Sequence, residues 1–175
     1  MATKRARGLG AGRAASQDGL SGPIASKDVA RIFTDVPGQA DRIKHNGFIR
    51  GYIQNWQKVQ PATLAATIPP TVLATEIVLQ FDTDNGASAT NASFRNDDLA
   101  QGFTPFAFAA PSRLPNAYAV SQEQRLTSYT TYYQGIAWTR GPFLCSVALT
   151  SCDPPTGTND IVALAVRQDA ASPRH

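Results

Sequence analysis

The stretch Thr71–Asp82, TVLATEIVLQFD, decides the fold class of this chain. Its side chains fall into two alternating sets: Thr75, Ile77, Leu79 and Phe81 on one side, and Glu76, Gln80 and Asp82 on the other. A period of two residues is typical of a β-strand with one buried face. The following Thr83-Asp84-Asn85-Gly86 has the composition of a turn and predicts the end of that strand.

Most of the chain beyond this strand also predicts β-structure. Residues 83–102 are polar and predict a loop with at most one helical turn near Asp97–Ala100. Further strands are predicted at 103–109, 118–122, 125–138, 143–151 and 161–167. Because these strands are irregular in length and spacing, we predict an all-β fold, a jelly-roll or Greek-key sandwich, in preference to an even up-and-down barrel.

The N-terminal part of the chain has a different pattern. Residues 26–36 predict a short helix, with Ser26 as a cap and Asp28 in the first turn, which Pro37-Gly38 ends. Residues 46–60 fit either a helix or an irregular strand, and the β-rich sequence after them favours the strand. Residues 1–25 are rich in Gly, Ala and Ser and predict a flexible arm. The predicted organisation is an arm at 1–25, a β-domain at 26–170 and a frayed tail at 171–175.

Composition narrows the class of protein. Charged residues make up 17% of the 175 residues, below the roughly 25% of average proteins, while hydrophobic residues make up 42%. Charged side chains are depleted at the cores of protein interfaces, so a subunit that buries several faces against copies of itself would have this composition. The longest apolar runs are too short for a transmembrane helix, and the basic N-terminus has no apolar segment typical of a secretory signal. We therefore expect a self-associating protein without a membrane partner.

Positive charge is concentrated near the N-terminus. Residues 1–60 hold ten Lys or Arg and four Asp, a net charge of +6, whereas residues 61–175 hold six Arg and nine acids, a net charge of −3. The predicted nucleic-acid-binding residues are Lys4, Arg5, Arg7, Arg13, Lys27 and Arg31. The first four can neutralise phosphates without reading base sequence. The alternative is a solubilising tail, in which case the binding surface would be sought around Lys27, Arg31, Arg42, Lys44, Arg50 and Lys58.

Catalytic motifs are weak in this sequence. His45 lies in RIKHNG, which predicts a solvated loop, and no nucleophile elbow or phosphate loop is present. The chain is therefore predicted not to be an enzyme and to need no cofactor. Cys145 and Cys152 are seven residues apart, which places them on opposite faces of a regular strand and predicts buried thiols rather than a mutual disulfide.

Two side-chain groups leave alternatives open. The acidic pairs Asp82/Asp84 and Asp97/Asp98 are expected to be solvated turn residues, with a calcium ion shared between subunits as the other possibility. The aromatic residues Tyr129, Tyr132, Tyr133 and Trp138 would suit either a sheet face or subunit contact, which we favour, or the stacking of single-stranded bases.

The order of these segments resembles the coat proteins of small icosahedral RNA viruses, including satellite viruses. The likeness lies in the opening MATKRARGLGAGRAAS, the short helix and the Thr- and Ala-rich β-domain. It implies a jelly-roll subunit that assembles into an icosahedral shell, packages nucleic acid, RNA above all, through its basic arm, and resides in the virion or in the host cytoplasm during assembly. The alternatives are a single-strand nucleic-acid-binding β-barrel outside a capsid and a lectin-like or receptor-binding sandwich.

Overall fold

The computed structural model describes residues 13–14, 21–33, 37–57, 72–106, 114–125, 130–152 and 157–171. Its strands are β1 (Arg13–Ala14), β2 (Gly22–Ile24), β3 (Phe48–Gln57), β4 (Val72–Phe81), β5 (Thr104–Pro105), β6 (Tyr118–Arg125), β7 (Thr130–Arg140) and β8 (Phe143–Cys152). Its helices are α1 (Ser26–Phe33), α2 (Gln39–His45), α3 (Asp84–Ala100) and α4 (Thr158–Ala171). No helix within these residues is long and apolar enough to cross a membrane.

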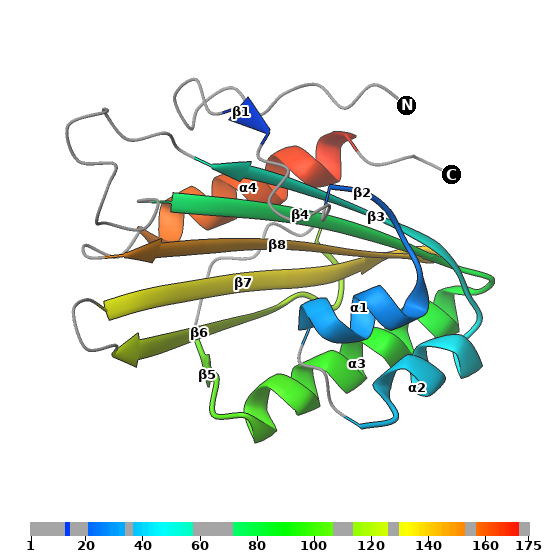
Figure 1. The fold of residues 1–175 in the computed structure, drawn as a ribbon. Helices are drawn as coiled ribbons and strands as arrows, with labels where there is room; N and C mark the ends of the chain where they lie inside the picture. Colours follow the sequence, from blue (N-terminus) through cyan, green and yellow to red (C-terminus); the bar gives the residue numbers. More distant parts are fainter. Residues whose placement is uncertain are drawn as a thin grey trace.

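Within the described residues the eight strands form one antiparallel sheet (Figure 1). The order is β1-β3-β4-β8-β7-β6-β5, and β2 also pairs with β3. β6, β7 and β8 form a meander, whereas β4 lies between β3 and β8. The chain therefore crosses from the middle of the sheet to its far edge between β4 and β6, and α3 makes most of that crossing.

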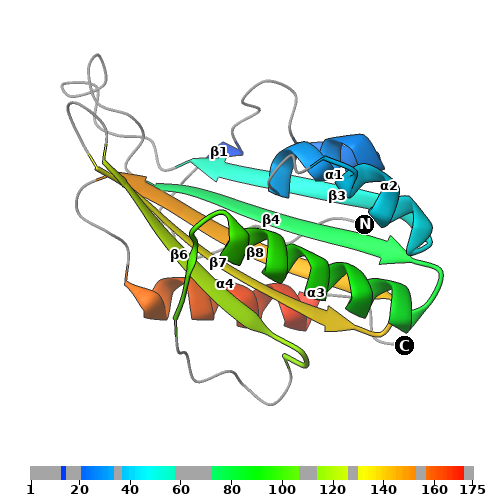
Figure 2. The same ribbon diagram turned by 90° about the horizontal axis from the view of Figure 1, so that it is seen from below.

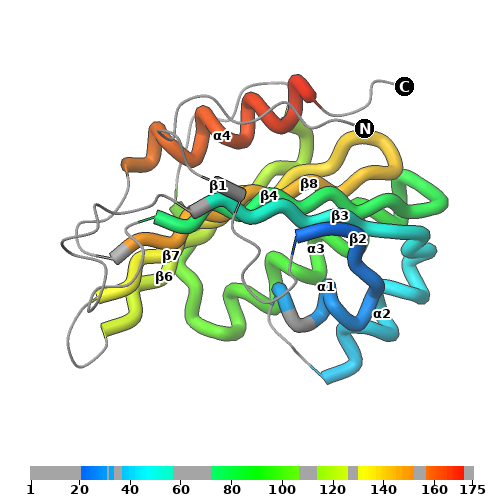
Figure 3. The backbone as a smooth tube through the Cα atoms, turned by 45° about the horizontal axis from the view of Figure 1, so that its top comes forward, coloured from blue at the N-terminus to red at the C-terminus, as the bar shows by residue number. Residues whose placement is uncertain are grey.

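Helices lie on both faces of the sheet, α1, α2 and α3 on one and α4 on the other (Figures 2 and 3). Each face therefore has its own hydrophobic core. Large buried side chains on the side of α1–α3 are Ile43, Ile53, Leu79, Phe81 and Phe94. Those on the side of α4 are Ile136, Trp138, Leu149, Ile161 and Leu164.

The predicted all-β class is confirmed in its coarser form, since the described residues are mostly β, and several predicted elements are correct. The strands predicted at 71–82 and 143–151 are β4 and β8, residues 46–60 contain β3, and the helix predicted at 26–36 contains α1. The cap of α1 differs in detail, because the Asp28 carboxylate accepts a hydrogen bond from the Ala25 backbone N–H at 2.9 Å. Cys145 is buried in the core beside α4, as predicted.

The jelly-roll or Greek-key sandwich needs correction. All the described strands belong to one sheet, and helices rather than a second sheet pack on its two faces. Alternating side chains indicate that one face of a strand is buried, but either helices or a second sheet can cover that face. The pattern of the strands therefore did not distinguish the two architectures.

The predicted polar loop at 83–102 is wrong, because this segment forms α3. Thr83 caps the helix by accepting a hydrogen bond from the Gly86 N–H at 3.1 Å. The buried side chains recur at helical spacing: Ala87, Thr90, Asn91, Phe94 and Asp98. Most of them are small or polar, so the helical face had no hydrophobic signature.

The predicted closing strand at 161–167 is also wrong, because these residues lie in α4. Ile161 and Val162 favour strands, but the residues that are buried follow a helical period: Ile161, Leu164, Ala165, Gln168 and Asp169. The last two are polar, which conceals the period. The Gln168 side-chain amide donates to the Ile77 carbonyl oxygen at 3.1 Å, so a buried hydrogen bond fixes the end of α4 against β4.

The boundary of the arm predicted at 1–25 also moves. Gly22–Ile24 pair with Ile53–Gly51 of β3, and Arg13–Ala14 pair with Gln57–Trp56. These two short segments are part of the sheet, while residues 1–12 and 15–20 lie outside the described residues. The strand predicted at 103–109 is shorter, since β5 contains Thr104–Pro105 alone. At the other end, Ala171 belongs to α4, and 172–175 lie outside the described residues.

Candidate nucleic-acid interface

Part of the predicted nucleic-acid-binding set can be placed. Lys4, Arg5 and Arg7 lie outside the described residues, as does Lys58. Arg13 is the first residue of β1, and Lys27 and Arg31 are in α1, where Lys27 is exposed. The structure therefore brings the placed members to elements that pack on or pair with β3.

The charge asymmetry of the sequence has a spatial counterpart. The described residues from 13 to 57 contain six Lys or Arg and two Asp, and they form β1, β2, α1, α2 and β3. The described residues from 72 to 171 contain four Arg and eight acids. Figure 3 shows β2, β3, α1 and α2 gathered at one edge of the molecule, so positive charge is concentrated at that edge.

Helix α2 presents part of this charge because its other face is anchored. Gln39 and Ile43 are buried, so Lys44 and His45 in the last turn face outward. Basic residues also favour this position, because the helix C-terminus carries a partial negative charge. His45, predicted to lie in a loop, is instead the last residue of α2.

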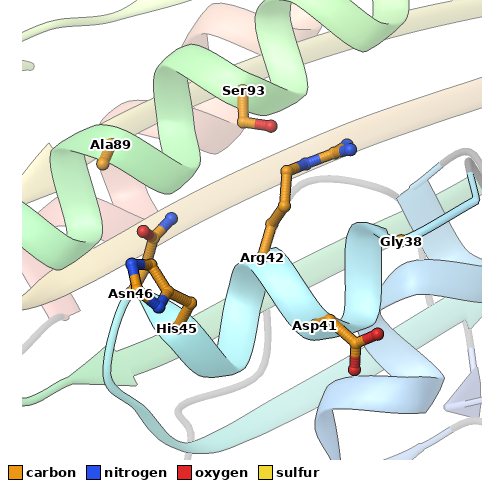
Figure 4. A pocket seen from close by; sticks show the side chains of 7 residues that line it. All are labelled: Gly38, Asp41, Arg42, His45, Asn46, Ala89 and Ser93. Atoms are coloured by element: carbon orange, nitrogen blue, oxygen red, sulfur yellow. The ribbon is translucent and has the colours of Figure 1, made fainter.

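A shallow open groove of about 500 Å³ lies between α2 and α3 (Figure 4). Its lining consists of Gly38, Asp41, Arg42, His45, Asn46, Ala89 and Ser93. The two helices approach closely at one end, where a Cβ on Gly86 would meet the Asn46 carbonyl oxygen. Arg42 extends into the groove, whereas Asp41 points away from α3.

Arg42 is already paired within the protein, although 42% of its side-chain surface is exposed. Its Nη2 donates to Oδ2 of Asp97 at 2.6 Å, and the amide of Gln39 donates to the same oxygen at 3.2 Å. Asp97 is 18% exposed, and this ion pair links α2 to α3 through Arg42, which lines the groove. The exposed basic side chains beside it are those of Lys44 and His45.

The members of the two acidic pairs differ in their surroundings. Asp97 faces Arg42, whereas the neighbouring Asp98 is buried and accepts a hydrogen bond from the Tyr118 hydroxyl at 3.1 Å. Asp82 and Asp84 are exposed on either side of the α3 cap. Among the described residues, no three His, Cys, Asp or Glu side chains come together as a metal site would require.

The aromatic residues of β7 serve mainly as core. Trp138 has no exposed surface, and Tyr133 packs edge to face on Phe103 with ring centroids 5.4 Å apart. Tyr132 is half-buried, and Tyr129 lies outside the described residues. The sheet-face interpretation is therefore confirmed for Trp138, which cannot stack on bases in this fold.

Two carboxyl groups with raised pKa values were not apparent from the sequence: Asp98, which is buried, and Glu76, which is half-buried. Burial raises the pKa of Asp98 to about 6, the hydrogen bond from Tyr118 lowers it in part, and the charge of Asp97 raises it. Burial also raises the pKa of Glu76 on β4 to about 7, against a lowering effect of Arg167. Burial and the nearby Asp98 raise the pKa values of Tyr118 and Tyr133 above their ordinary range. A polar residue at a buried helix or strand position gives no hydropathy signal, so only the tertiary structure identifies these groups.

We expect the protein to be more stable near pH 5 than near pH 8. A carboxyl group with a raised pKa binds its proton more readily in the folded state, so the free energy of unfolding falls as pH rises from 4.5 to about 7 for Glu76. Glu76→Gln should raise stability near pH 8 by about 2–3 kcal/mol and flatten this dependence, which urea unfolding at both pH values measures. The control Glu123→Gln, at an exposed position, should keep the wild-type dependence; an unchanged dependence in Glu76→Gln would contradict the assignment.

Comparisons with known proteins do not define a family. No family model matches the sequence, and no curated protein matches it. Among solved structures, the chain is similar to the extracellular domain of PknH from Mycobacterium tuberculosis, with 10% sequence identity and a TM-score of 0.44. That alignment covers 78% of this chain and 72% of the other. The function is accordingly inferred from this chain's own residues.

Proposed function

We propose that this chain is a structural subunit that assembles with copies of itself into a shell and binds nucleic acid, RNA above all, by charge. The observation that carries nucleic-acid binding is the separation of charge between the β1–α1–α2–β3 edge and the rest of the fold. Phosphate contacts from Lys and Arg need no base readout, so a cluster of cations at one edge is sufficient for non-specific binding.

The basic residues nearest the N-terminus are tethered to the same edge. Arg13 pairs with Gln57 of β3, and Lys4, Arg5 and Arg7 precede it by at most nine residues. Nine residues span at most about 32 Å when extended. These cations and those of α1 and α2 can therefore act on one nucleic-acid strand.

Self-assembly is supported by composition. A charge fraction of 17% leaves much of the surface to neutral residues, as in proteins that bury several faces against partners. A shell would also compensate for the weakness of a single arm, because many arms displayed together bind one polymer with higher avidity.

The second candidate is a nucleic-acid-binding protein that does not assemble. One sheet with helices on both faces favours it, since the resemblance to coat proteins implied a jelly roll. Both candidates share the charged edge and differ in whether copies associate.

Light scattering on nuclease-treated protein, followed by titration with a single-stranded oligonucleotide, tests both candidates. For the shell we expect a particle far larger than 18.7 kDa that binds the oligonucleotide, with an elevated ratio of 260 to 280 nm absorbance before nuclease treatment. A monomer that binds would support the second candidate. A monomer that does not bind at low salt would overturn both.

A further inference from the structure

β6 forms an edge of the sheet and is covered on its outer side over only part of its length (Figure 1). β5 pairs with Val120 and Ser121, and the Phe106 N–H donates to the Ala119 carbonyl oxygen at 3.2 Å. Within the described residues, nothing pairs with the outer side of Gln122–Arg125. The last three of these residues are exposed.

The backbone groups on this free segment point outward at alternate residues. Because the Ala119 carbonyl faces β5, the residues at intervals of two from it also direct their N–H and C=O groups away from β7. Glu123 and Arg125 are those residues in the free segment. Neither side chain forms an ion pair with another described side chain, and no described strand pairs with their outward backbone groups.

We propose that the β6 edges of two copies of this chain pair antiparallel about a two-fold axis at Gln124, with Glu123 of each copy opposite Arg125 of the other. In this register the outward N–H and C=O groups of Glu123 and Arg125 form two hydrogen-bonded pairs, one on each side of the axis. Each pair places a carboxylate opposite a guanidinium on the same face of the joined sheets, which favours this alignment. A shift by one residue in either direction would lose the opposition.

The contact is small and therefore weak. β5 covers the edge as far as Ser121, so pairing involves about three residues of each copy and four backbone hydrogen bonds. Stable dimers generally bury a much larger area. The proposal concerns a contact between copies and does not depend on nucleic-acid binding.

Cysteine cross-linking of the full-length chain tests the register. In Gln124→Cys the two cysteines would face each other across the axis, with Cα atoms about 4.5 Å apart, within the range of a disulfide. In the matched variant Gln122→Cys, on the same strand and sheet face, they would lie about 13 Å apart along the strand and could not bond. We expect mild oxidation to cross-link the first at least about tenfold faster than the second on non-reducing gels. Equal rates, or cross-linking in the unmodified chain at the same rate, would overturn the proposal.

Charge exchange in the Gln124→Cys background tests the complementarity. Glu123→Arg places two arginines opposite each other at both pairs, so cross-linking should slow by about tenfold. The double change Glu123→Arg with Arg125→Glu restores opposite charges and should restore the rate. If the single change has no effect, or the double change does not recover it, the charges act otherwise and the proposed pairing is wrong. Circular dichroism of each variant shows that β6 and its neighbours remain folded.

Discussion

Replacing Lys4, Arg5, Arg7 and Arg13 with glutamine should abolish most nucleic-acid binding while leaving the fold intact. The core side chains identified among the described residues are unchanged, and Arg13 keeps its backbone pairing with Gln57. If all four cations contact single-stranded phosphates, they contribute a slope of about −3 to the plot of log affinity against log salt. Between 50 and 200 mM salt the unmodified protein should lose about 50-fold in affinity, and the variant should show little of this change.

Fluorescence anisotropy with a labelled oligonucleotide over a salt series gives the measurement. Arg95→Gln is the matched control, because Arg95 is exposed on α3 and lies outside the β1–α1–α2–β3 edge. It should leave the slope unchanged, whereas each N-terminal substitution should reduce it by about 0.7. If the fourfold variant binds like the unmodified protein, the N-terminal cations only confer solubility. The cations to substitute next would then be Lys27, Arg31, Lys44, Arg50 and Lys58.

Asp169→Ala should destabilise the fold by about 3 kcal/mol. Asp169 is 2% exposed in α4 and accepts hydrogen bonds from Arg140 Nη1 at 3.0 Å and from Trp138 Nε1 at 3.3 Å. Removing the carboxylate leaves a guanidinium that is largely buried and an indole N–H without this acceptor, and an unpaired buried charge is costly. Since proteins of this size are stable by roughly 5–15 kcal/mol, the loss should be evident as a lower midpoint in urea unfolding.

Two further variants separate the ion pair from the hydrogen bonds. Asp169→Asn keeps an oxygen acceptor for Trp138 but removes the charge opposite Arg140, and should lie between the alanine variant and the unmodified protein. Asp160→Ala changes an exposed carboxylate in the first turn of the same helix and should cost less than about 1 kcal/mol. A similar loss for Asp160→Ala and Asp169→Ala would contradict the special contribution of the buried contact, because alanine itself favours a helix.

The sequence alone determined those elements whose signal is local. β4 is predicted by alternation over Thr71–Asp82, and α1 by Asp28 in its first turn and by Pro37-Gly38 after it. The run Phe143–Leu149 predicted β8 as well. This run is also almost continuously apolar, which is typical of strands covered on both faces. The structure agrees, because Phe143–Val147 are all buried.

The tertiary structure decided what covers the sheet. α3 and α4 turn polar residues toward it, and each finds a partner distant in the sequence: Tyr118 for Asp98, the Ile77 carbonyl for Gln168, and Arg140 for Asp169. Such partners offset the cost of burying a polar side chain, but the residues next to Asp98 and Asp169 in the sequence do not indicate which partners they will have. Sequence patterns therefore predict a loop or a strand for a helix whose buried face is polar, because the partners of that face are distant in the sequence.

For the candidate nucleic-acid interface too, the sequence determined some features and the tertiary structure others. The excess of positive charge in residues 1–60 is a property of the sequence, because counting charges requires no fold. How these basic residues are presented depends on the tertiary structure. Arg42 pairs with Asp97 of α3, 55 residues further on, while Lys44 and His45 face outward because Gln39 and Ile43 anchor α2. Within the described residues, the unpaired edge at Glu123 and Arg125 also exists only in the folded sheet, because the pairing of β5 with β6 ends at Ser121. Local periodicity and net charge can be obtained from the sequence alone, whereas pairing between distant residues depends on how the folded chain brings them together.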